Sequence, residues 1–182
     1  MDQSPDRSLQ ETTDRYRALR QVTYELIESE YALLGITCSE ISVSDATQGD
    51  LWAGEWSDPQ RRPQWSWQEM YRTYRGKPGI KRFDLAVKSG GLLRGLCYGV
   101  PNQSKLILKI HAIARAPQEN PLRGMFFRVA IFGAAAYAKF LGSEEIWLVK
   151  PLNEVVAQYY MRFGFAPERD RSGVITHLAR RR

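Results

Sequence analysis

The second half of the sequence alternates strand and helix patterns, and this order limits the fold more than any other feature. In order, the hydrophobic spacing predicts a strand over 105–115, a helix over 123–141, a strand over 145–149 and a helix over 153–163. Gly142 and Gly164 end the two helices. Strands joined through single helices build one sheet with helices packed on it, so a mixed α/β domain with a central sheet is expected.

The first half predicts a long helix, a hairpin and irregular stretches. Hydrophobic residues recur three and four apart over 12–34, so a helix is expected there, whereas residues 1–10 are expected to lack regular structure. The segments that follow are a short strand over 38–43, irregular structure or short helical pieces over 45–64, a helix over 66–75, a turn at 76–79, hairpin strands over 82–88 and 92–100, and two short strands after Phe165.

The 182 residues suit one domain with a modest extension. We expect an N-terminal extension over 1–36 with one amphipathic helix, followed by a domain over 37–182. No segment is long and apolar enough to span a bilayer, and the start is too charged for a signal peptide, so a cytoplasmic protein without a membrane partner is expected. Cys38 and Cys97 are expected as buried free thiols, and two histidines make a metal site unexpected.

The helix over 153–163 carries the most specific pattern. Asn153 begins it, and Tyr160 lies four residues before the pair Gly164-Phe165. This pattern and the element order resemble the GNAT (Gcn5-related N-acetyltransferase) superfamily, by element order over 37–182 and by motif over 115–165. The resemblance implies a GNAT-like mixed central sheet of about six to seven strands flanked by helices, here with an extra N-terminal helix. It also implies acetyl-CoA as cosubstrate and direct acyl transfer to an amine.

Tyr160 is the expected general acid. A phenol near a thioester sulfur can protonate the thiolate as it leaves, and the resemblance places Tyr160 there. The alternative is a core aromatic, because the neighbouring Tyr159 and Tyr160 are not expected to face the same way on a helix.

The general base is not fixed by the resemblance. The candidates are His111, Asp84, Glu144 and Glu145. His111 has the most suitable intrinsic pKa, although a lone histidine in a strand is more often structural.

The loop before the helix over 123–141 is where the resemblance places the coenzyme diphosphate. Gly124 matches the first glycine of the motif, whereas Pro121 and Phe126 replace a Gln or Arg and a small residue. A helix N-terminus offers unpaired N–H groups and a favourable dipole to phosphate. The residues expected to bind the coenzyme are Ile113, Ala114, Arg115, Arg123, Gly124, Met125, Phe126, Phe127 and Asn153.

The acceptor and the activity leave alternatives open. Four of the five tryptophans lie between Trp52 and Trp67, where they either form an aromatic wall for an acceptor or, as we prefer, pack helices onto the sheet. The irregular phosphate loop fits a catalytically degenerate binding or regulatory module. The net charge of +6 and the arginine-tryptophan stretch fit a toxin-type enzyme acting on aminoacyl-tRNA. The acceptor is therefore an amine on a small molecule, a protein or a charged tRNA, and a homodimer is possible.

Overall fold

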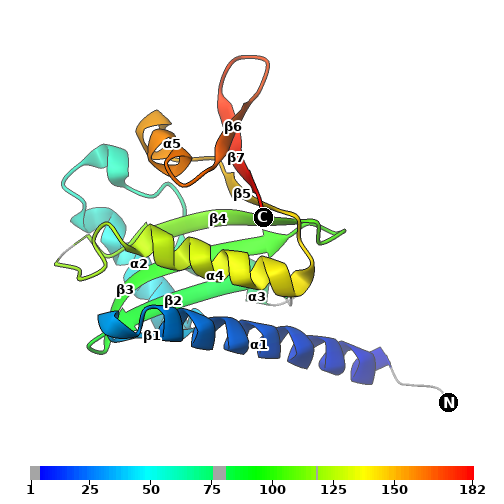
Figure 1. Cartoon of the computed structure of the whole chain (residues 1–182). Helices are drawn as coiled ribbons and strands as arrows, with labels where there is room; N and C mark the ends of the chain where they lie inside the picture. The colour runs from blue at the N-terminus through cyan, green and yellow to red at the C-terminus, as the bar shows by residue number, and fades with distance from the viewer. Residues whose placement is uncertain (1–4, 76–80, 118) are drawn as a thin grey trace.

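Seven strands form one sheet in the computed structural model, which describes residues 5–75, 81–117 and 119–182 (Figure 1). In spatial order they are β1 (Ile36–Ser39), β2 (Phe83–Ser89), β3 (Leu92–Pro101), β4 (Ile107–Arg115), β5 (Glu145–Val149), β7 (Ile175–Arg181) and β6 (Ala166–Arg169). Strands β4 and β5 pair in parallel, and all the other neighbours pair antiparallel. The expected mixed sheet flanked by helices is confirmed.

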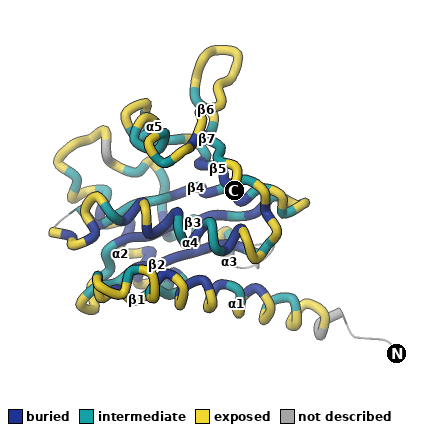
Figure 2. The backbone as a smooth tube through the Cα atoms, in the orientation of Figure 1, coloured by how far each residue is buried: buried dark blue, intermediate teal, exposed yellow. Residues whose placement is uncertain are grey.

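Helices cover the two faces of the sheet. The five α-helices of the described residues are α1 (Pro5–Glu30), α2 (Val43–Glu55), α3 (Trp67–Arg75), α4 (Phe126–Leu141) and α5 (Glu154–Met161). Helices α1 and α4 lie side by side on one face and share the larger hydrophobic core with β2, β4 and β5. Trp52 of α2 and Trp67 of α3 pack in a second core on the other face. Figure 2 shows the burial that results, deepest along the central strands.

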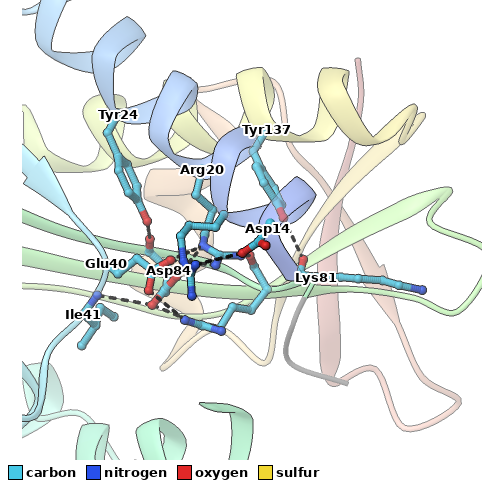
Figure 3. A network of polar contacts seen from close by, with 10 residues as sticks. Asp14, Arg20, Tyr24, Glu40, Ile41, Lys81, Asp84 and Tyr137 are labelled. Carbon is cyan, nitrogen blue, oxygen red and sulfur yellow. Dashed lines mark hydrogen bonds and ion pairs between the residues drawn. The ribbon is translucent and has the colours of Figure 1, made fainter. Parts of the chain in front are cut away.

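Helix α1 is tied to the sheet by a buried network of charged groups (Figure 3). Its Arg20 is only 3 % exposed and pairs with Glu40, with an Nη2–Oε1 distance of 2.7 Å. Arg82 bridges Glu40 and Asp84, at 3.1 Å and 3.2 Å. Each buried charge thus faces an opposite one, as burial of ions requires. Because Tyr24 of α1 is also buried in the main core, α1 packs as an integral layer of the fold.

Several expected boundaries need correction. Helix α1 begins at Pro5, so residues 5–10, which were expected to lack regular structure, are helical. The expected strand over 38–43 lies at Ile36–Ser39. Regular helix α2 replaces part of the irregular segment expected over 45–64, because Ser42 and Asp45 form a capping box.

Other expectations hold or fall outside the described residues. The hairpin β2–β3 is confirmed. Cys38 and Cys97 are free thiols, Cys97 buried and Cys38 half-buried. Residues 1–4 and the turn expected at 76–79 lie outside the described residues. Within the described part of the chain, no helix combines the length and the apolar character needed to cross a bilayer.

Candidate functional site

Strands β4 and β5 separate halfway along β4. Their pairing runs from Ile107 opposite Glu145 to Ile110 opposite Leu148, although β4 continues to Arg115. The register between β3 and β4 also shifts here, so that His111 is an extra residue in a β-bulge. The last part of β4 therefore keeps its β3 partner but has an open edge on the β5 side.

A cavity of about 520 Å³ opens at this fork. Its walls come from the end of β4, the turn before α4, helix α5 and the segment between α2 and α3. The predicted residues that line it are Ile113, Ala114, Arg115, Arg123, Gly124, Phe126, Phe127, Asn153 and Tyr160. The other lining residues are Trp56, Asp58, Gln60, Val155, Val156 and Tyr159. One cavity thus gathers residues that are far apart in the sequence.

The turn before α4 leaves a set of amides open. The amides of Arg123, Met125 and Phe126 donate to backbone oxygens of the turn itself, at 2.8–2.9 Å. In the described part of the chain, those of Gly124, Phe127 and Arg128 have no backbone acceptor. Gly124 is exposed and has a left-handed φ of 78°, which favours glycine. Gly124 and Phe127 are among the residues predicted to bind the coenzyme, whereas Arg128 is not.

Asn120 organises this turn, and sequence reasoning missed it. Its Oδ1 accepts the amide of Leu122 at 2.9 Å, and its Nδ2 donates to the Arg94 carbonyl at 2.8 Å. Its own carbonyl accepts the amide of Arg123 at 2.9 Å. Asn120 is 9 % exposed, so these bonds are shielded from water. The dipeptide Asn120-Pro121, a known turn initiator, is the signal that identifies it.

Phe126 does not fill the cavity, despite replacing a small residue of the motif. Its side chain is 3 % exposed, and its ring lies over the backbone of Gly95 in β3. A Cβ atom at position 95 would overlap the ring carbons of Phe126. The missing side chain of Gly95 therefore provides the space that the bulky Phe126 needs.

Tyr160 of α5 lines the cavity. Its ring stacks on Phe127, with ring centroids 4.5 Å apart and an interplanar angle of 17°. Burial raises the pKa of Tyr160 well above its usual value, so the phenol keeps its proton at neutral pH. Tyr159 lines the same cavity and also packs on Phe127, with centroids 5.6 Å apart. The two tyrosines thus line one cavity although they are adjacent on α5.

Asn153 joins two walls of the cavity. Its Oδ1 caps α5 by accepting the amide of Val156 at 2.9 Å, and its Nδ2 donates to the carbonyl of Gln60 at 3.0 Å. Nearby, the guanidinium of Arg115 lies 4.9 Å from the ring centre of Trp56. These two contacts hold the segment between α2 and α3 against β4 and α5. Asn153 is the expected N-cap, and its contact with coenzyme stays a prediction.

Of the four base candidates, His111 is the one that lies near Tyr160 in the described structure. Both residues line a smaller pocket of about 100 Å³ beside the main cavity. Asp84 is buried in the network under α1, Glu145 accepts a hydrogen bond from the Trp147 indole, and Glu144 is exposed. Burial, and then the charges of Lys109 and Lys150, lower the pKa of His111.

The tryptophans divide between core and site. Trp52 and Trp67 are 2 % and 1 % exposed and pack α2 and α3 on the sheet, as preferred. Trp56 lines the main cavity and Trp65 the smaller pocket. The stretch therefore presents no continuous aromatic surface in the described structure.

Known proteins resemble this chain in structure but not in sequence. No protein-family model matches the sequence, and no curated protein matches it. Among solved structures, the PaiA N-acetyltransferase from Thermoplasma acidophilum in complex with coenzyme A is 15 % identical, with a TM-score of 0.58 over 81 % of this chain and 99 % of that one. A mutant of spermidine N-acetyltransferase SpeG from Vibrio cholerae is 18 % identical, with a TM-score of 0.58 over 81 % and 94 %. The ribosomal-protein-S18-alanine N-acetyltransferase from Escherichia coli is 14 % identical, with a TM-score of 0.55 over 79 % and 90 %. The chain therefore has the fold of the GNAT superfamily of N-acetyltransferases.

Proposed function

We propose that this protein is an acetyl-CoA-dependent N-acetyltransferase that moves the acyl group directly to an amine. One observation carries the proposal: a single cavity joins the open edge of β4, the free amides before α4 and the protonated Tyr160. These three parts are what an extended thioester with a diphosphate at one end requires of a protein.

The residues present fit the coenzyme. The amides of Gly124, Phe127 and Arg128 lie at the positive end of the α4 dipole and suit a diphosphate. Arg123 is exposed at the rim of the cavity and adds a cation there. The open edge of β4 offers backbone groups over 113–115 to the amides of the pantetheine arm, as in strand addition.

Two side chains supply the proton transfers. The coenzyme, when bound, would supply an activated acyl group. Tyr160 holds a proton that it can give to the departing sulfur. His111 is neutral at pH 7 and can take the proton of the amine, directly or through a water.

The proteins with similar structures support both substrates. PaiA is named as a complex with coenzyme A, and YncA from Salmonella typhimurium is named with its cofactor acetyl-CoA. Two others are named for amine acceptors, spermidine and the alanine of ribosomal protein S18. An amine acceptor and acetyl-CoA are therefore the substrates to test first.

Two measurements test the proposal. The first is thermal unfolding with and without acetyl-CoA, and the second is an assay of thiol release with a panel of amines. A ligand that binds only the native state raises the free energy of unfolding, by about 2.7 kcal/mol when its concentration is 100 times its Kd. The midpoint temperature of unfolding rises with it. We expect a rise with acetyl-CoA and amine-dependent release of thiol. A rise without any release would instead favour the degenerate binding module, and no rise would exclude coenzyme binding.

A further inference from the structure

The ring of Phe127 lies at the centre of an aromatic cluster that joins α4 to α5. Phe127 is the second residue of α4 and is 6 % exposed. Its ring stacks on that of Tyr160, with centroids 4.5 Å apart and an interplanar angle of 17°. The rings of Tyr159, Phe163 and Phe165 surround it at 5.6, 4.8 and 6.4 Å, with interplanar angles of 64°, 61° and 62°. Of these four rings, Tyr160 is the one that lies nearly parallel to Phe127.

This stack is the contact that orients the phenol of Tyr160. In the described part of the chain, no group forms a hydrogen bond with the Tyr160 hydroxyl. The ring of Tyr159 gives a looser contact, at 5.9 Å and 55°. Because a stacked pair of rings prefers a narrow range of distance and tilt, Phe127 restrains the direction in which the phenol points.

The backbone of Phe127 belongs to the proposed diphosphate site. Its amide has no backbone acceptor in the described structure, and the N-cap residue Met125 makes no side-chain capping bond. If this turn holds the coenzyme diphosphate as proposed above, the phosphate oxygens complete bonds that the first turn lacks, and they restrain it. A side chain moves with its own Cα atom, so an anion that restrains this turn also restrains the Phe127 ring.

The preceding residue anchors the same turn on the other side. Phe126 is 3 % exposed, and its ring lies over the backbone of Gly95 in β3. The start of α4 is therefore held against the sheet by Phe126 and against α5 by Phe127. Closely packed interiors transmit small displacements, and Phe127 is the ring through which this turn contacts Tyr160.

We propose that Phe127 is a positioning residue that couples the coenzyme diphosphate to the general acid. A diphosphate on the open amides holds the first turn of α4 and the Phe127 ring with it, and the stacked Tyr160 then keeps one orientation. A donor without the diphosphate leaves the turn unrestrained, so Tyr160 samples other orientations. Binding energy from a distant part of the coenzyme thus raises kcat instead of only lowering KM.

Two acyl donors test this coupling. Acetyl-CoA and S-acetylpantetheine carry the same thioester, and the second lacks the diphosphate, so the ratio of their kcat values reports what the diphosphate does after binding. We expect acetyl-CoA to turn over faster in the unaltered protein by about threefold to tenfold, the effect of one stacked aromatic pair. Phe127→Leu keeps the open amide but removes the ring, so the kcat ratio should fall to about 1. Phe127→Tyr keeps a ring and should retain the ratio.

Phe163→Leu is the matched control. Phe163 packs on Phe127 in the same cluster, but in the described structure its ring does not contact that of Tyr160, and it does not line the cavity. Its loss should lower the free energy of unfolding and leave the kcat ratio unchanged. Urea unfolding shows that each variant is folded.

NMR relaxation of the tyrosine rings gives a readout that does not depend on activity. Tyr160→Phe identifies the signal of Tyr160 by its loss. The order parameter of the Tyr160 ring should be higher in the complex with coenzyme A than in the complex with pantetheine. Phe127→Leu should remove this difference.

The outcomes separate the coupling from the activity. Equal kcat values for the two donors in the unaltered protein, or an unchanged ratio in Phe127→Leu, would overturn the coupling and leave the proposed activity intact. The same fall of the ratio in Phe163→Leu, or equal order parameters in the two complexes, would overturn the coupling as well. Release of thiol from neither donor would refute the activity itself, and the order parameters would then decide the coupling.

Discussion

The ring of Phe126 lies directly over the backbone of Gly95, where no other residue would leave it room. This pairing explains how the chain departs from the phosphate-loop motif and still keeps an open cavity. The large residue at the start of α4 packs against β3 and is 3 % exposed, while in the described structure the amides of Gly124, Phe127 and Arg128 have no backbone acceptor.

Replacing Gly95 tests this relationship. Gly95→Ala should force the Phe126 ring out of its place, lower the free energy of unfolding by about 1–3 kcal/mol and weaken coenzyme binding. Gly54→Ala is the control, because Gly54 is exposed in α2 and no atom lies within 4 Å of an added Cβ. This change should raise the free energy of unfolding by about 0.5–1 kcal/mol. Urea unfolding measures both. Equal effects of the two variants would show that Gly95 has no special role.

Asn120 should matter for phosphate binding in particular. Asn120→Ala leaves the Leu122 amide and the Arg94 carbonyl without their partner, so the turn before α4 should loosen. We expect the Kd for coenzyme A to rise roughly tenfold, while the Kd for pantetheine, which lacks the diphosphate, changes little. Calorimetry with both ligands gives the comparison.

Asn102→Ala is the control for that measurement. Asn102 braces the β3–β4 turn by accepting the Ile107 amide at 3.1 Å, and it does not line the cavity. It should cost stability without changing either Kd. If Asn120→Ala weakened the binding of coenzyme A and of pantetheine equally, Asn120 would support only the fold.

Tyr160→Phe should separate catalysis from binding. Loss of the phenol proton should lower kcat by about 100-fold or more, with little change in the KM for acetyl-CoA, because the ring still stacks on Phe127. Tyr159→Phe changes the neighbouring residue in the same cavity and should keep kcat. Steady-state kinetics decides, and an unchanged kcat in Tyr160→Phe would remove its assigned role.

The pKa of His111 sets a pH dependence with a definite sign. Burial, Lys109 and Lys150 lower this pKa below 6.5, so the folded protein keeps His111 neutral where the unfolded chain already binds a proton. Stability should therefore fall as the pH drops from 6.5 toward the folded pKa, and level off below it. Lys150→Met removes one repulsion and should raise the pKa of His111. NMR titration of the imidazole follows both effects, and a midpoint above 6.5 in the unaltered protein would contradict them.

Much of the fold follows from local patterns in the sequence. The hairpin β2–β3, strand β5 and helix α4 lie close to the expected positions, because alternation and helical spacing state directly which side chains face the core. Helix α2 was expected only as short pieces, since Gly49 and Gly54 are typical of irregular segments. In the structure Gly49 instead lets α2 pack closely on Trp67, a contact that only the tertiary structure reveals.

The candidate site was predicted in its parts but not in its internal contacts. Ile113, Arg123 and Tyr160 were expected from a motif, and they do line one cavity. The pairing of Phe126 with Gly95 joins a helix to a strand about 30 residues earlier, which no local pattern contains. The hydrogen bond from Asn120 to the Arg94 carbonyl also joins residues that are far apart in the sequence.

The most direct test is an NMR titration of the backbone amides with coenzyme A. If a diphosphate binds before α4, the amide signals of Gly124, Phe127 and Arg128 should shift most, and those of Gly142 at the far end of the helix should stay unchanged. A complex whose largest shifts lie elsewhere, with these three signals unmoved at saturation, would contradict the account.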